Sequence, residues 1–209
     1  MGISANLSKR TKGVAKPATR VISVPPSDEK GFEKKVKEFN KVLTGEQQEA
    51  LAEYKLEKFE PINEMLRNPE DIEDIFMPFD ETPDTLREMI DALDESFFTL
   101  EEDATVYRGG WLGEGLKVGD TFGDEAYAST SLSFDVAHGY AEGALTSDFG
   151  DVTTVWELEI PKGTEIALPC CEHMDELEIL LQRGVKVEVT DITMKGTEVR
   201  VIHAVVAPS

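Results

Sequence analysis

The spacing of apolar side chains in the first half of the chain predicts helices. In 80–97, Thr82 precedes Pro83 at a helix start, and apolar side chains follow at i, i+3, i+4 and i+7. Another helix is expected to begin after Thr44, because Gln47 is placed to complete a capping box with it. The expected helices are 31–42, a segment that follows Thr44, 59–67 and 80–97.

From residue 104 onward the apolar pattern has a period of two, which is typical of strands. The clearest case is 152–160, where Trp156, Leu158 and Ile160 alternate with other side chains. Strands are expected at 105–108, 125–131, 152–160, 165–168, 176–181, 186–192 and 198–206, with a short helix at 135–142 capped by Ser133. Because the helices come first and the strands follow, the order favours an α+β fold over an alternating α/β fold.

Two carboxylates lie close together in the expected strand 176–181. Side chains two residues apart point to the same face of a strand, so Glu176 and Glu178 share a face. Like charges separated by only about 7 Å repel each other. Such a pair is expected to border a cleft in which a cation, from the protein or from a ligand, lies opposite. An exposed strand face is the alternative interpretation, since Glu prefers the surface.

The charge of the chain is strongly acidic but uneven. Its formal net charge is -21, with 42 acidic and 21 basic residues, so phosphate backbones are repelled and nucleic acid is not expected as a partner. Every charged residue in 1–26 is basic. We therefore expect a flexible basic arm over 1–30 and one domain over 31–209, a length that suits a single domain.

Apolar runs in the sequence are short. None approaches the roughly 20 residues that span a bilayer, and no apolar segment follows the N-terminal basic residues. We expect a soluble protein without membrane contact and without a Sec signal peptide. Cys170 and Cys171 are neighbours, which suits neither a mutual disulfide nor, with His173 alone nearby, a zinc site, so no metal is expected.

Three short motifs stand in a recognisable order. Tyr107-Arg108-Gly109 ends one expected strand, Ser129-Thr130-Ser131 ends a later one, and Glu176-Leu177-Glu178 lies within a third. In this order and at these spacings the sequence resembles the mono-ADP-ribosyltransferases of the R-S-E class. That class includes the enzymatic components of clostridial binary toxins, vertebrate ecto-transferases and bacteriophage-encoded modifiers. The resemblance covers about 43–206 and includes Tyr54 and Asn63 in the helical lead-in.

The resemblance implies a fold and a reaction. The fold would be the ADP-ribosyltransferase fold, with two packed, mainly antiparallel β-sheets, an N-terminal helical subdomain and an NAD cleft between the sheets. The protein would be a glycosyltransferase, described in some classifications as a nucleotidyltransferase. It would act as a toxin or effector that uses NAD as substrate and needs no metal.

Each motif residue then has an implied role. Glu178 would hydrogen-bond the ribose of NAD, where positive charge grows in the transition state. Ser129 would hydrogen-bond Glu178, and Arg108 would hold the pyrophosphate or ribose with its guanidinium fork. Tyr140 or Phe134 would lie against the nicotinamide. The remaining NAD-site residues would be Tyr107, Gly109, Thr130 and Ser131.

The residue at 176 would select the acceptor. In the family, Glu at this position accompanies arginine acceptors, and a carboxylate can orient a guanidinium and accept its proton. The implied partner is a target protein modified on arginine, with basic patches that suit the acidic charge, and the loop 169–175 would face it. We expect a monomer in the cytoplasm of the cell that makes it, or of a host if it is phage-encoded or injected.

Other functions compete with this one. The same pocket could transfer ADP-ribose to water, as an NAD glycohydrolase does, and the sequence cannot separate the two. A non-catalytic NAD-binding or phage structural module of the same fold is a further alternative. A glycosidase is disfavoured, because carboxylates two residues apart on one strand cannot flank a sugar from opposite sides.

Overall fold

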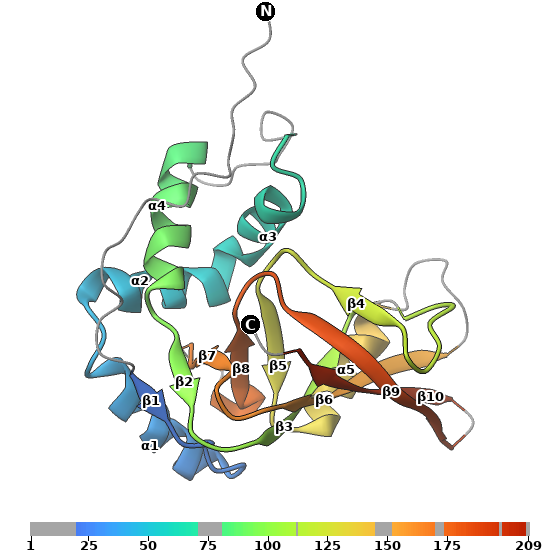
Figure 1. Cartoon of the computed structure of the whole chain (residues 1–209). Coiled ribbons are helices and arrows are strands. Elements are labelled where there is room, and N and C mark those ends of the chain that lie inside the picture. The colour runs from blue at the N-terminus through green and yellow to red at the C-terminus, as the bar shows by residue number, and fades with distance from the viewer. Residues whose placement is uncertain are drawn as a thin grey trace, which may run out of the picture.

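The computed structural model describes residues 20–70, 81–111, 113–144, 152–169, 174–196 and 198–207. Its helices are α1 (Glu29–Asn40), α2 (Gly45–Glu53), a π-helical turn η1 (Tyr54–Lys58), α3 (Phe59–Arg67), α4 (Pro83–Asp94), α5 (Phe134–Ala144) and a 3-10 turn η3 (Met174–Glu176). Helices α2, α3 and α4 lie together on one side of the molecule, and most of the strands lie on the other (Figure 1). No helix in the described ranges is both long and apolar enough to cross a membrane.

The helix starts follow from their capping residues. Thr44 Oγ1 accepts from Gln47 N at 3.2 Å and Gln47 Oε1 accepts from Thr44 N at 3.1 Å, so the expected capping box is confirmed. Thr82 likewise caps α4, with proline at its first turn. Helix α1 begins two residues before the expected Gly31, because Asp28 Oδ1 accepts from the Gly31 amide at 2.9 Å.

The strands form one hydrogen-bonded sheet in which one pair of neighbouring strands, near the middle, is joined by few hydrogen bonds. They are β1 (Val21–Ile22), β2 (Phe98–Leu100), β3 (Ala104–Gly109), β4 (Thr121–Gly123), β5 (Ala128–Ser131), β6 (Thr153–Ile160), β7 (Glu165–Ala167), β8 (Glu178–Leu181), β9 (Lys186–Lys195) and β10 (Val199–Val206). Their order is β1-β2-β7-β8-β5-β3-β6-β10-β9-β4, and all pairs are antiparallel except β1 with β2 and β6 with β10.

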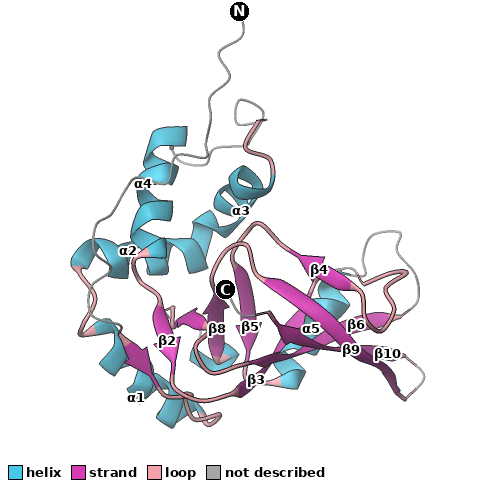
Figure 2. Ribbon diagram, viewed as in Figure 1, coloured by secondary structure: helices cyan, strands magenta, loops and turns pink. Residues whose placement is uncertain are grey.

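The two expected sheets are the two halves of this order. Strands β3 and β5 pair only at Tyr107 and Ser131, so the junction between the halves rests on one residue pair. Figure 2 shows β2, β8 and β5 turned away from β6, β9 and β10. The expected α+β fold with mainly antiparallel strands is confirmed.

Two sequence-based boundaries differ from the structure. Residues 20–30, assigned to the flexible arm, contribute β1, which pairs with β2, and the cap of α1. The expected strand 125–131 begins only at Ala128, and β4 was not expected. Residues 1–19 lie outside the described part of the chain.

The strand expected at 176–181 is wrong in its first two residues. Glu176 lies in η3, and Leu177 has a φ of 49°, which breaks the alternation of side chains on which the shared face depended. The turn places Leu177 in the core, and its carbonyl accepts from the Leu132 amide at 3.2 Å. Strand β8 therefore starts at Glu178.

A buried core joins the helical part to the strands. Its largest fully buried side chains come from both parts, for example Tyr54 of η1, Leu86 of α4, Tyr127 before β5 and Trp156 of β6. The Tyr54 and Tyr127 rings pack edge to face with centroids 5.5 Å apart. This contact fixes η1 against the start of β5, the strand that carries Ser129, Thr130 and Ser131.

Gly109 is required where β3 passes under α5. A Cβ there would lie 2.2 Å from Ala137 O and 2.6 Å from Ala141 N, and both are backbone atoms of α5. We expect Gly109→Ala to lower the free energy of unfolding by about 2–3 kcal/mol, because the helix must move away from the strand. Urea unfolding would measure this. Gly139 lies within α5 itself and has open space around it, so Gly139→Ala should be neutral or stabilising by up to about 1 kcal/mol. Equal stability of the two variants would contradict the close packing.

Candidate active site

A cavity of about 300 Å³ lies where the two halves of the strand order meet. Its wall comes from η1, α3, β3, β5, α5, η3 and β8. The predicted site residues that line it are Glu176, Glu178, Arg108, Tyr107, Gly109, Ser129, Thr130, Ser131 and Tyr140. Segments far apart in the sequence thus converge on one cavity, and of the predicted set Phe134 alone is absent from its wall.

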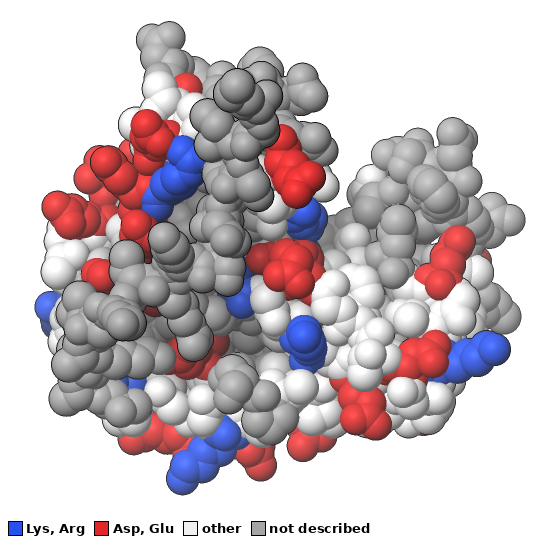
Figure 3. Space-filling view, turned by 45° about the horizontal axis from the view of Figure 1, so that its top comes forward, with Lys and Arg blue, Asp and Glu red and all other residues white. Residues whose placement is uncertain are grey.

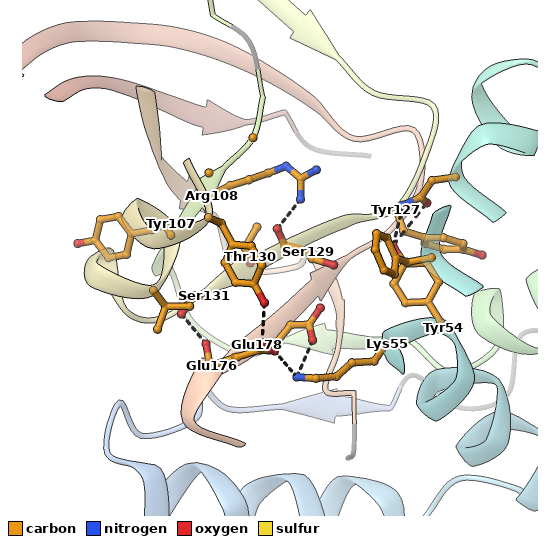
Figure 4. A pocket seen from close by; sticks show the side chains of 17 residues that line it. Tyr54, Lys55, Tyr107, Arg108, Tyr127, Ser129, Thr130, Ser131, Glu176 and Glu178 are labelled. Carbon is orange, nitrogen blue, oxygen red and sulfur yellow. Dashed lines mark hydrogen bonds and ion pairs between the residues drawn. The ribbon is translucent and has the colours of Figure 1, made fainter. Parts of the chain in front are cut away.

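A lysine joins the two carboxylates. Lys55 Nζ of η1 lies 2.8 Å from Glu176 Oε2 and 2.9 Å from Glu178 Oε2, and the lysine side chain is only 6% exposed (Figure 4). Burial opposes the charge of the ammonium group, but its interactions with Glu178 and Glu176 outweigh burial and raise the pKa of Lys55. The expected cation opposite the carboxylates is therefore present, although the carboxylates meet across a turn and not along a strand face.

Glu176 is also held from α5. Tyr140 Oη donates to Glu176 Oε1 at 2.6 Å, so hydrogen-bonding or ionic partners engage both oxygens of this carboxylate. Burial, followed by the hydrogen bond to Glu176, raises the pKa of Tyr140 to about 12. Tyr140 is 60% exposed at the edge of the cavity. On one side of the cavity, a continuous series of polar contacts thus runs from Tyr140 through Glu176 and Lys55 to Glu178.

Arg108 is held as a partly buried cation. Its guanidinium lies 4.7 Å from the centre of the Trp111 ring, and its NH1 donates to Ser129 O at 2.5 Å. Burial lowers its pKa, and its Nε is a buried donor without a partner in the described residues. An unpaired donor beside a cavity costs stability and suits a ligand that brings an acceptor.

Asp124 holds the Trp111 ring, over which the Arg108 guanidinium lies. Its carboxylate accepts from Arg67 at 2.9 and 2.8 Å and from the Trp111 indole at 3.0 Å. It also accepts from the Ala126 amide at 3.0 Å. Burial would raise the pKa of Asp124, but the hydrogen bonds from Arg67, Ala126 and Trp111 outweigh burial and hold it below its usual value. Sequence reasoning missed Asp124 and Trp111, because no motif marks them.

The Ser-Thr-Ser motif holds the backbone around Glu176 and Glu178. Thr130 Oγ1 donates to Ile179 O at 2.6 Å, and Ser131 Oγ donates to Glu176 O at 2.6 Å. The predicted hydrogen bond from Ser129 to Glu178 is not formed. Lys55 pairs with Glu178, and the Ser129 hydroxyl instead interacts with the Tyr54 hydroxyl, where it partly opposes the rise in the pKa of Tyr54 that burial causes.

Of the two candidate aromatic residues, Tyr140 is the one at the cavity. Phe134 packs edge to face on Tyr107 with centroids 5.6 Å apart, and the ammonium of Lys195 lies 3.6 Å from its ring centre. The Phe134 ring therefore belongs to the packing of α5 on the strands.

The helical side of the cavity contains residues that the strand motifs did not reveal. Asn63 Nδ2 donates to Tyr54 Oη at 3.1 Å, and burial, the largest effect, raises the pKa of Tyr54 to about 12. In the sequence, Tyr54 and Asn63 are marked only by the family resemblance. Sequence reasoning missed Lys55, Phe59 and Tyr127. For Lys55 the reason is that a lysine in a charged helical segment gives no signal of its partner.

The described residues contain no group of three or more His, Cys, Asp or Glu side chains placed to hold a metal ion. Cys170, Cys171 and His173, together with most of the loop 169–175, lie outside the described residues.

Solved structures of known proteins share this architecture. Plx2a, an ADP-ribosyltransferase toxin from Paenibacillus larvae, is 22% identical, with 86% of this chain and 94% of that one covered and a TM-score of 0.63. The ADP-ribosyltransferase Vis of Vibrio splendidus, in complex with agmatine, is 16% identical, with 88% of each chain covered and a TM-score of 0.60. BECa of C. perfringens, an ADP-ribosylating toxin solved with NADH, is 17% identical, with 85% of this chain and 47% of that one covered and a TM-score of 0.63. At these identities the likeness shows the fold.

The family follows from the sequence match. Compared by sequence with curated proteins, the chain matches none. The model of the ADP-ribosyltransferase exoenzyme family, however, matches residues 31–207, which is most of the chain. The resemblance stated from the three motifs is therefore confirmed, and the chain belongs to the ADP-ribosyltransferase exoenzyme family.

Proposed function

We propose that this protein transfers ADP-ribose from NAD to arginine side chains of a target protein and releases nicotinamide. ADP-ribosyl transfer is the activity of its family. The observation that carries the finer proposal is the convergence of Glu176 and Glu178 on one cation, within a cavity that Arg108 also lines.

NAD fits the residues of the cavity. Its pyrophosphate offers acceptor oxygens, and Arg108 presents a guanidinium whose Nε has no partner in the described part of the chain. Tyr140 offers an exposed aromatic ring at the cavity edge for the nicotinamide end. BECa, which shares the fold, is known in complex with NADH.

The chemistry requires a negative charge beside the ribose. When the bond between the ribose carbon and the nicotinamide nitrogen breaks, its electron pair leaves with the nicotinamide and positive charge grows on the ribose. The carboxylate of Glu178, fixed at the start of β8, would stabilise that charge more in the transition state than in bound NAD. A nitrogen of the arginine then bonds to the ribose carbon and gives up a proton, for which Glu176 is the proposed base.

The acceptor is inferred from the position of Glu176. It already binds one cation, Lys55, at 2.8 Å, so the local charge suits a guanidinium. Vis, of the same fold, is known in complex with agmatine, a small compound that carries a guanidinium group. Acidic side chains are spread over the face shown in Figure 3, which agrees with a target that presents basic patches. We further propose that the protein acts as a monomer in the cytoplasm.

Glu176→Gln tests the acceptor assignment. We expect nicotinamide release to stay within a few-fold of wild type, while labelling of arginine-containing acceptors falls by roughly a hundredfold, because Gln cannot accept the guanidinium proton. Radiolabelled NAD with polyarginine or a cell lysate would measure both quantities in one reaction.

The matched control is Asp175→Asn, which removes an exposed carboxylate from the same 3-10 turn and should leave both quantities unchanged. Undiminished labelling by Glu176→Gln would contradict the assignment. If the wild-type protein releases nicotinamide and labels nothing, the NAD glycohydrolase takes the place of the transferase.

A further inference from the structure

Lys55 occupies a position that a substrate cation would need. Its Nζ lies 2.8 and 2.9 Å from one oxygen each of Glu176 and Glu178, and its side chain is almost fully enclosed. The lysine side chain enters from η1, on the helical side of the cavity, while the carboxylates come from η3 and β8 (Figure 4). The ammonium therefore neutralises part of the negative charge that would otherwise face an incoming cation.

Both oxygens of Glu176 already have a partner at the position where a guanidinium would bind. Lys55 engages Oε2, and the Tyr140 hydroxyl engages Oε1. A guanidinium that pairs with both oxygens of Glu176 therefore competes with Lys55 and Tyr140 for them. The lysine is the more direct competitor because it carries the same charge as the acceptor. Its ammonium is a point charge on a flexible four-carbon chain, so it can leave Glu176 and keep its contact with Glu178.

A neighbouring lysine shows what a purely structural version of this arrangement looks like. Lys58 lies three residues further along the same π-helical turn and also bridges two carboxylates, those of Glu53 and Glu81. None of these three side chains lines the cavity. The two lysines are thus alike in local structure and in pairing, and they differ in whether their carboxylates face the site.

We propose that Lys55 is a tethered competitor of the acceptor guanidinium, a positioning residue that sets how tightly an acceptor binds between Glu176 and Glu178. The proposal rests on the proposed arginine acceptor. While Lys55 is paired, the acceptor subsite is closed to other cations. The apparent affinity for a guanidinium is therefore the intrinsic affinity multiplied by the fraction of molecules in which the lysine has moved away. Free guanidines are then poor acceptors, and a target protein must bring further contacts to displace the lysine.

Agmatine binding to the full-length protein tests this directly. Calorimetry at pH 8 without NAD would compare wild type with Lys55→Met and with Lys55→Gln, which keeps a polar side chain without the charge. Both uncharged variants are expected to bind agmatine about tenfold more tightly than wild type. Lys55→Arg, which retains a cation, and Lys58→Met, the matched control, should each stay within about twofold of wild type. In turnover with NAD, the KM for agmatine should fall in Lys55→Met by a similar factor.

The direction of the change separates competition from support. If Lys55 merely held the site together, its removal would weaken agmatine binding. The proposal is overturned if Lys55→Met and Lys55→Gln bind agmatine no more tightly than wild type does. It is also overturned if none of the proteins binds agmatine detectably. The binding measurement does not depend on turnover. A wild-type protein that neither releases nicotinamide nor labels arginine therefore disproves the proposed function, whereas the calorimetry decides the role of Lys55.

Discussion

Glu178→Gln is expected to lower the rate of nicotinamide release from NAD by about a hundredfold to a thousandfold, with the transfer rate falling equally. The amide keeps the shape of the side chain and most of its hydrogen bonding but has no charge to offset the positive ribose. Glu178 is mostly buried at the start of β8, where the antiparallel pairing of Ser131 with this residue fixes its backbone. The effect should therefore appear in kcat, with little change in the KM for NAD.

Glu159→Gln is the control for this experiment. Glu159 is an exposed residue of β6 outside the cavity wall, so the same chemical change there should leave the rate unaltered. A Glu178→Gln protein that releases nicotinamide at more than a tenth of the wild-type rate would remove Glu178 from the proposed mechanism.

Asp124→Ala is expected to give the largest loss of stability, about 2–4 kcal/mol in the free energy of unfolding. The Arg67 side chain is 44% exposed, so its ion pair contributes little of this loss. Most of the loss comes from the Trp111 indole and the Ala126 amide, which are buried and would have no acceptor. Urea unfolding at pH 7 measures the difference, and Glu188→Ala, an exposed change on β9, should stay within about 0.5 kcal/mol of wild type.

The same carboxylate predicts a pH dependence. The pKa of Asp124 is lower in the folded protein than in the unfolded chain, where it is about 3.9. Its charge therefore contributes stability that is fully present above the unfolded pKa and is lost as the pH falls through the folded pKa. The stability difference between wild type and Asp124→Asn should accordingly be constant from pH 5 upward and shrink in stronger acid. A difference that grows on acidification would contradict this role.

The sequence by itself determined the local elements and the order of the motifs. Helix starts could be predicted at Thr44 and Thr82, because capping depends on residues within one turn of each other. The α+β class followed from the change of period at residue 104, and the three motifs identified the family that the match over residues 31–207 confirms. These features are local or ordered along the chain, so a single sequence carries them.

The tertiary structure decided how the site is assembled. Glu176 and Glu178 meet through a turn at Leu177 and not along a strand, since Leu177 has a positive φ and the surrounding core and the hydrogen bond to its carbonyl hold it there. The pairing of Lys55 with both carboxylates depends on the contact of Tyr54 with Tyr127 that holds η1 beside the start of β5, which no spacing in the sequence reports. The choice of Tyr140 over Phe134 at the cavity likewise depends on which face α5 turns toward β3. Contacts between distant segments are set by the shared core, and the charges of the site are therefore partnered only when that core has formed.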